Sequence, residues 1–289
     1  MSNPTAPFLL GADAKKNTSQ SAKALFAHIR KEKGPEHREP VYLIINSKIQ
    51  LAKTKDYTPR IIPITHKLDR LEEKSVLLVT KDPSTPYRQP LNEKNSPTED
   101  VFNQIYTLTK LRGIAREPRK LSKLFKEFDV IVADNRVHKF LPGVLGAQFY
   151  VKNKKIPFMV QMAKPDVNAQ LVRGPKSTKL KDDRCEPAYV RAQMKSIVRN
   201  ASFIPPANGN CMSIKVGYTD LKVEELVQNV NDVVRYLVET KNQPVGGILR
   251  SKKNIQSIHL KTSESVSMPV WKEAVEEVED EEDNSDFEF

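Results

Sequence analysis

The side chains best suited to chemistry in this sequence are clustered cations, whose chemistry is ionic contact with phosphate groups. One cluster surrounds residues 250–267, where basic side chains flank a strand-like segment that also carries hydroxyl groups, and one further lysine comes from an earlier strand. The candidate RNA-binding residues are Lys215, Arg250, Lys252, Lys253, Lys261, Thr262, Ser263, Ser265 and Ser267. Cations contact phosphates, and hydroxyls reach the 2′-hydroxyls of RNA. The alternative is an ordinary solvated face.

A second basic patch lies within residues 110–126. Its seven cations are Lys110, Arg112, Arg116, Arg119, Lys120, Lys123 and Lys126. Only Glu117 interrupts them before Glu127. The patch predicts either a second phosphate-binding surface or the solvated face of a helix.

The overall charge agrees with a polyanionic partner. The chain carries 47 basic and 36 acidic residues, a formal +11. Ten of those acids lie in the last seventeen residues, so residues 1–272 carry 47 basic against 26 acidic residues, a formal +21. A body this positive favours nucleic acid over a small substrate. We expect residues 272–289 to form a disordered acidic tail, which either contacts a partner or only keeps the protein soluble.

Motifs for catalysis, cofactors or metals do not stand out. The five histidines match no ligand spacing, and no glycine-rich phosphate loop follows a predicted strand. Cys185 and Cys211 lie 26 positions apart, which predicts reduced thiols and neither a disulfide framework nor a zinc site. No apolar run is long enough for a membrane span, and the N-terminus does not resemble a secretion signal. We therefore expect no enzyme, no cofactor, no metal and no membrane contact.

The elements that position these cations follow from periodicity. Residues 1–17 are predicted as a flexible arm, and a helix is predicted over 21–33 because apolar residues recur at helical spacing. Strands are predicted at 41–45 and 60–64. Residues 76–160 alternate strands (76–79, 129–133, 156–160) with helices, including one starting at Thr98, after a loop at 82–97. This alternation is typical of βαβ units around a parallel sheet.

The last third of the chain is predicted to be mixed. A basic loop at 164–185 precedes a helix at 187–200 and a strand at 212–216. The clearest helix spans 224–239, where Leu and Val form a full-length apolar stripe. A last strand is predicted at 255–262, ahead of the acidic tail.

Several of these segments, in this order, resemble the ribosomal protein L1 family. Residues 76–80, 128–134 and 141–146 are similar to its inserted domain, and residues 213–217 and 255–269 to its returning segment. The stretch 257–269 (SIHLKTSESVSMP) resembles the carboxyl-terminal motif shared by eukaryotic nucleolar assembly factors of this family, the fungal small-subunit processome branch above all.

The resemblance implies an α/β fold of two domains. The first, a discontinuous RNA-binding domain, would comprise residues 18–75 and 161–271, and a Rossmann-like domain at 76–160 would be inserted into it. It further implies a non-enzymatic ribosome-assembly factor in the nucleolus, acting as a monomer within a large ribonucleoprotein. Its partners would be the ribosomal RNA precursor and either other assembly factors or basic ribosomal proteins. The alternatives are a mature large-subunit stalk protein and, more distantly, an enzyme using the βαβ domain.

Two departures from the ribosomal protein bear on RNA contact. That protein packs a Thr-Met-Gly step on ribosomal RNA after its last strand, where this sequence reads Thr262-Ser263-Glu264. The family's aromatic contact before the first strand is replaced by Arg38-Glu39-Pro40. Glu264 would repel a phosphate group if it faced the RNA.

Overall fold

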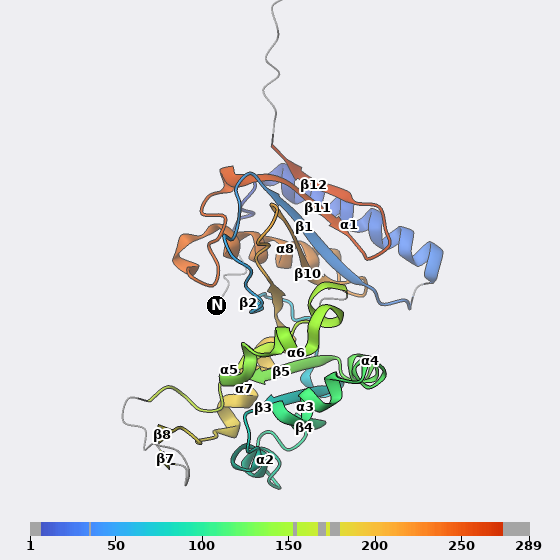
Figure 1. Cartoon of the computed structure of the whole chain (residues 1–289). Helices are drawn as coiled ribbons and strands as arrows, with labels where there is room; N and C mark the ends of the chain where they lie inside the picture. Colours follow the sequence, from blue (N-terminus) through green and yellow to red (C-terminus); the bar gives the residue numbers. More distant parts are fainter. Residues whose placement is uncertain (1–6, 35, 153–154, 167–171, 174–179, 274–289) are drawn as a thin grey trace, which may run out of the picture.

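The computed structural model describes residues 7–34, 36–152, 155–166, 172–173 and 180–273. Two four-stranded sheets organise these residues into two lobes, one above the other in Figure 1. One lobe is built on an antiparallel sheet and is called the antiparallel lobe, and the other is built on a parallel sheet and is called the parallel lobe.

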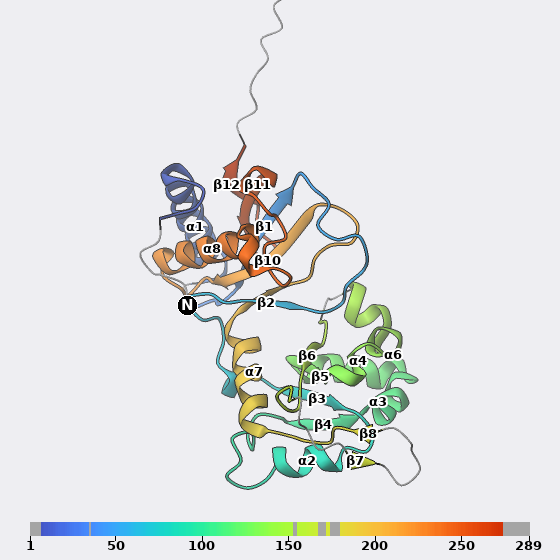
Figure 2. The same ribbon diagram turned by 90° about the vertical axis from the view of Figure 1, so that its left-hand side faces the viewer.

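The antiparallel sheet has the strand order β10-β1-β11-β12. Its strands are β1 (Pro40–Ser47), β10 (Cys211–Tyr218), β11 (Ile255–Lys261) and β12 (Met268–Lys272). Residues of β1 alternate between half-buried and buried, and the buried set packs against α1 (Ala12–Lys33) and α8 (Val223–Val238). Both helices lie on the same side of the sheet (Figure 2). In the part of the chain that the structure describes, no helix packs on the second face of this sheet (Figure 2).

Helix α1 begins at Ala12, before the predicted start at residue 21. The prediction of an arm over residues 1–17 is therefore wrong for residues 12–17, while residues 1–6 lie outside the described part. Ala14 and Thr18 are buried at the spacing that continues through Ala22, and the Thr18 hydroxyl donates to the Ala14 carbonyl oxygen at 2.6 Å. Small and hydroxyl side chains thus extend the buried stripe where no large apolar residue marks it.

The parallel sheet has the strand order β4-β3-β5-β6. Its strands are β3 (Val76–Thr80), β4 (Gln104–Thr107), β5 (Val130–Asp134) and β6 (Phe158–Val160). Around it lie α2 (Thr85–Leu91), α3 (Leu108–Ala115), α4 (Pro118–Glu127), α5 (Asn135–His138) and α6 (Leu141–Ala147), followed by a π turn at Gln148–Lys152. All strand pairs in this sheet are parallel, as the alternation predicted.

The predicted helix at Thr98 is wrong. Residues 104–107 form β4, in which Ile105 pairs with Leu78 of β3, and α2 occupies the predicted loop at 82–97. The Asn103 amide oxygen accepts from the Val76 backbone N–H at 2.6 Å and starts the pairing. Ile, Tyr and Thr favour strands, and this outweighed an apolar spacing that only resembled a helix.

The chain crosses between the lobes twice. β2 (Arg60–Ile62) pairs with β9 (Ala201–Phe203), the 3₁₀ turn Leu71–Glu73 follows β2, and α7 (Pro187–Arg199) precedes β9. We predicted that the first domain resumes at residue 161. Instead, Val190, Met194 and Ile197 of α7 pack into the core of the parallel lobe. The apolar face of α7 covers the sheet that it follows, so that boundary was placed too early.

Four shorter elements complete the described residues: β7 (Val172–Arg173), which pairs with β8 (Leu180–Lys181), and the 3₁₀ turns at Thr240–Asn242 and Lys252–Asn254. The basic loop at 164–185 therefore contains a short antiparallel pair. The predicted acidic tail begins inside a strand, because Lys272 ends β12, and residues 274–289 lie outside the described part.

Candidate nucleic-acid interface

The first basic cluster is divided between the two ends of β11. Lys252 and Lys253 lie in the 3₁₀ turn just before this strand, and Lys261 is its last residue. Ile255 pairs with Ser47 and Lys261 with Tyr42, at opposite ends of β1. At about 3.3 Å per residue, the two ends are roughly 20 Å apart. Arg250, Lys252 and Lys253 are exposed and Lys261 is half-buried. One compact contact surface therefore does not contain all four cations.

The turn after β11 is closed by its own hydroxyl groups. The Thr262 backbone N–H donates to the Ser265 hydroxyl oxygen at 2.9 Å, and the Ser265 N–H donates to the Thr262 hydroxyl oxygen at 3.3 Å. Thr262 is buried, whereas Ser263 and Ser267 are exposed. Among the predicted hydroxyl residues, Ser263 and Ser267 are thus the ones presented to a partner.

Glu264, at the tip of this turn, is neutralised by Lys33. The Lys33 ammonium lies 2.8 Å from the Glu264 carboxylate and 3.5 Å from that of Glu39. The hydrogen bond and charge of Lys33 lower the pKa of Glu264, and the pKa of Lys33 is raised in turn. The unfavourable charge expected at this position is therefore compensated by a residue at the end of α1.

Lys215 and Lys261 lie in one row across the helix-free face of the antiparallel sheet, since Tyr42 pairs with both. This face lines a cavity of about 850 Å³ together with Tyr57, Tyr150 and Lys155, which come from the linking loop and the parallel lobe. The rings of Tyr57 and Tyr150 pack edge to face at 5.0 Å. The predicted residue Lys215 therefore faces a cleft between the lobes.

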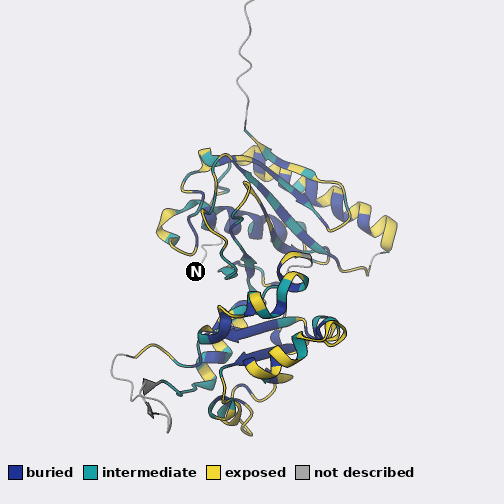
Figure 3. Ribbon diagram, viewed as in Figure 1, coloured by how far each residue is buried: buried dark blue, intermediate teal, exposed yellow. Residues whose placement is uncertain are grey.

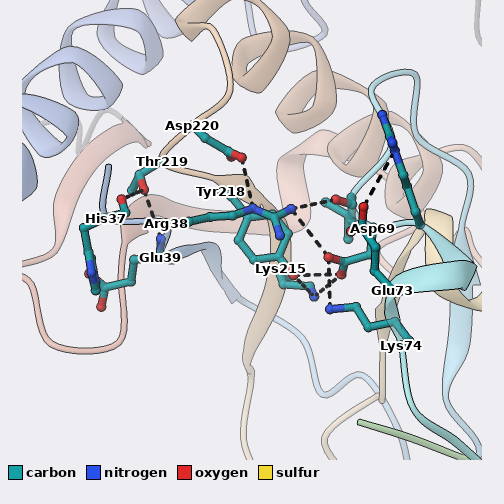
Figure 4. Close-up of polar contacts among 12 residues, drawn as sticks. His37, Arg38, Glu39, Asp69, Glu73, Lys74, Lys215, Tyr218, Thr219 and Asp220 are labelled. Atoms are coloured by element: carbon teal, nitrogen blue, oxygen red, sulfur yellow. Dashed lines mark hydrogen bonds and ion pairs between the residues drawn. The ribbon is translucent and has the colours of Figure 1, made fainter. Parts of the chain in front are cut away.

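Asp69 lies in the segment that joins the lobes, and its carboxylate forms an ion pair with Lys215 (Figure 4). Its carboxylate lies 3.3 Å from the Lys215 ammonium, 3.2 Å from that of Lys74 and 3.5 Å from the Arg38 guanidinium. The Tyr218 hydroxyl donates to it at 2.7 Å, and Arg38 stacks 3.8 Å over the Tyr218 ring. Lys215 is thus part of a charged cluster at the junction, a role that no local sequence pattern indicated.

The second basic patch is entirely exposed. It spans two helices, because α3 ends at Ala115, Arg116 is its C-cap, and Pro118 begins α4. Leu121 and Leu124 anchor α4 in the core, and the cations of this helix occupy exposed positions. The ribbon of α4 is largely exposed in Figure 3. Among the described residues, Lys120 alone of the seven forms an ion pair, with Glu117 at 2.8 Å. The remaining six are available to an anionic partner.

The described part of the chain contains no group of three His, Cys, Asp or Glu side chains arranged for a metal ion. Cys185 is half-buried and Cys211 exposed, and both are free thiols. None of the described helices is long and apolar enough to cross a membrane.

The chain is similar in sequence to a known protein family and to several known proteins. The profile of the ribosomal protein L1p/L10e family matches residues 12–266. Ribosome biogenesis protein UTP30 of Saccharomyces cerevisiae is 38% identical over 87% of this chain and 88% of its own length. A putative ribosome biogenesis protein of Schizosaccharomyces pombe, C8F11.04, is 29% identical over 81% of this chain and 54% of its own length.

A more distant relative, large ribosomal subunit protein uL1 of Drosophila melanogaster, is 24% identical over 53% of this chain and 55% of its own length. The family profile covers both lobes, and the yeast relative aligns over nearly its full length. Together with the parallel sheet inserted between the strands of an antiparallel one, these matches confirm the expected fold class. The chain belongs to the ribosomal protein L1p/L10e family.

Proposed function

We propose that this protein is a ribosome-assembly factor that binds pre-ribosomal RNA in early, small-subunit processome particles. The observation that carries the proposal is the 38% identity, over almost all of both chains, to a protein named for ribosome biogenesis. Two exposed basic regions on a body of formal charge +21 support RNA as the ligand.

The antiparallel lobe provides the first RNA surface in this proposal. Lys261, Ser263 and Ser267 lie at one end of β11, where Lys33 compensates Glu264. Cations there contact phosphates, and the exposed hydroxyls contact ribose. The protein acts without catalysis, as a monomer within a nucleolar ribonucleoprotein. Its other partners are assembly factors or basic ribosomal proteins.

A mature stalk protein of the large subunit is the weaker candidate. The uL1 relative aligns with about half of the chain at 24% identity, and the Met-Gly step of the ribosomal protein is replaced by Ser263 and Glu264. Crosslinking the tagged protein to RNA in fungal cells and sequencing the bound fragments separates the two. Reads in the small-subunit or spacer precursor support the assembly factor. Reads confined to the large-subunit stalk RNA would reject it.

A further inference from the structure

We propose that the parallel lobe binds one nucleotide of a single-stranded RNA at the carboxyl edge of its sheet, with the base against Phe140 and the phosphate among Lys81, Arg112 and Lys139. This inference rests on the proposed function and adds a second RNA contact, on the other lobe from Lys261.

The strand order places a crevice at this edge. The chain leaves β3 for β4 on one side and leaves β5 for β6 on the other, so the connections diverge between β3 and β5. Ligands of open parallel sheets bind outside the carboxyl ends of the strands at this point. A crevice of about 400 Å³ lies there. Its lining consists of Lys81 and Asp82 after β3, Leu108 of α3, and Arg136, Val137, Lys139 and Phe140 after β5.

Phe140 gives this crevice an accessible aromatic ring. Phe140 is 44% exposed, whereas the other aromatic residues of the described part are buried or half-buried. Its backbone N–H donates to the Val137 carbonyl oxygen at 3.0 Å, which holds the backbone of Phe140 just before α6. An exposed ring is a surface on which an unpaired base stacks.

Cations surround the ring. The Lys139 ammonium lies over the ring at 5.1 Å from its centroid and the Arg112 guanidinium at 6.0 Å, and Lys81 lines the same crevice. Lys139 and Arg112 are both exposed, so a base that stacks on the ring displaces one of them toward the phosphate. In the described residues none of these three forms an ion pair. Arg136 also lines the crevice but pairs with Asp134.

One carboxylate lies in this crevice, and it is already bonded. Asp82 accepts hydrogen bonds from the Thr109 N–H at 3.2 Å and from the Thr109 hydroxyl at 3.0 Å. Three unpaired cations against this single acid favour an anion, and an aromatic ring beside them favours a base attached to it.

The second basic patch extends the site to a longer strand. Arg112 lies on α3, Arg116 follows at the end of the same helix, and α4 then presents Arg119, Lys123 and Lys126 at i, i+4 and i+7. This spacing aligns the three α4 cations along one stripe of about 10 Å. Successive phosphates would follow that stripe. A duplex could use the stripe but could not stack a base on Phe140, because its bases are already stacked.

Binding titrations of the full-length protein test the site, with fluorescein-labelled oligouridine and an RNA duplex of equal length as probes. Phe140→Leu should weaken oligouridine binding roughly tenfold and leave duplex binding unchanged. The pair Arg112→Gln/Lys139→Gln should lower the salt slope for oligouridine by roughly 1.4, at about 0.7 per lost phosphate contact. The control, Lys16→Gln/Lys23→Gln on the exposed side of α1, removes the same charge and should leave the slope near that of the wild type.

Four results would overturn the inference. Phe140→Leu could bind oligouridine as the wild type does. The Arg112→Gln/Lys139→Gln variant could have the same salt slope as the Lys16→Gln/Lys23→Gln control. Free UMP could displace oligouridine at equal nucleotide concentration, which would indicate a mononucleotide site. A polyglutamate peptide, and not oligouridine, could require Arg112 and Lys139, which would indicate an acidic protein partner. A wild-type protein that binds neither RNA probe would instead contradict the proposed function itself.

Discussion

Asp69 is the residue whose loss should most affect the junction between the lobes. Burial disfavours its charge, but Lys215, the Tyr218 hydroxyl and Lys74 together set the pKa of Asp69 below its ordinary value. Asp69→Asn should lower the free energy of unfolding at neutral pH by roughly 1.5–3 kcal/mol, because hydrogen bonds to a charged group are lost. Urea unfolding followed by the fluorescence of Trp271, the single tryptophan, measures this.

The lowered pKa of Asp69 determines how the stability difference changes with pH. A carboxylate with a lowered pKa stabilises the fold above its unfolded pKa of about 3.9, and that stability is lost as pH falls through the lowered value. The difference between wild type and Asp69→Asn should therefore narrow in acid. Asp220→Asn, which removes an exposed partner of Arg38, is the control and should cost less than about 1 kcal/mol. A pH-independent difference would mean that the Asp69 charge is not responsible.

For individual residues, the sequence predicts which residue types are present in a site better than it predicts the role of each residue. Runs of cations are visible in the sequence itself, so the clusters around Lys252 and Lys261 and the second basic patch on α3 and α4 could be proposed as RNA-binding residues. The ion pair between Lys33 and Glu264 joins residues 231 positions apart, and the capture of Lys215 by Asp69 joins residues 146 positions apart. Such pairings depend on the sheet register and the lobe junction, which no local pattern encodes.

The strand β11 separates two groups of cations that should differ in their contribution to RNA binding. Lys261→Ala, beside Ser263 and Ser267, should lower the salt slope of RNA binding by about 0.7–0.9, the value for one lost phosphate contact. Lys252→Ala/Lys253→Ala, at the other end of the strand, should leave the slope within error of the wild type if the RNA occupies the Lys261 end. Titrations at several salt concentrations measure both. If Lys252→Ala/Lys253→Ala lowers the salt slope more than Lys261→Ala does, the RNA binds at the Lys252/Lys253 end of β11.

Elements were predictable where one signal dominated. Helix α8 carries Val and Leu at helical spacing along its whole length, and the strands β3 and β5 are short runs made mostly of Val, Leu and Ile; the structure confirms all three elements. Residues 98–108 carry apolar side chains at a spacing that also fits a turn followed by a strand, so the wrong element was predicted. The first turns of α1 bury Ala14 and Thr18, which hydrophobicity alone does not mark.

The acidic tail acts at the scale of the whole molecule. Residues 274–289 carry nine acids and lie outside the described part of the chain. We expect them either to screen the basic body from non-specific RNA or to contact a basic protein. Under the first role, deleting 274–289 should raise affinity for random RNA at low salt. The difference in RNA affinity between the full-length and the truncated protein should disappear near physiological salt, where the Debye length is about 8 Å. Equal binding at low salt, measured by fluorescence anisotropy, would leave only the partner role.

The parallel lobe should be removable as one unit, but at boundaries set by the structure. Its two chain ends meet where the Leu68 backbone N–H donates to the Arg199 carbonyl oxygen at 3.0 Å. Replacing residues 70–198 with a short Gly/Ser linker should therefore close a small gap, and loop closure costs only about 0.6 kcal/mol per doubling of length. The remaining antiparallel lobe keeps α1, α8 and all four of its strands, so it should fold and bind RNA through Lys261.

The control for this variant is a second one, in which the same linker replaces residues 76–160, the boundaries predicted from the sequence. That variant keeps α7, whose Val190, Met194 and Ile197 would lose the core that buries them. We expect it to aggregate or to expose apolar surface to a fluorescent dye, while the 70–198 replacement does not. Circular dichroism and size-exclusion chromatography distinguish the two, and residues 70–199 expressed alone should fold independently. If the 70–198 replacement is unfolded while the 76–160 replacement folds, α7 stabilises the antiparallel lobe, and the discontinuous-domain proposal is wrong at this boundary.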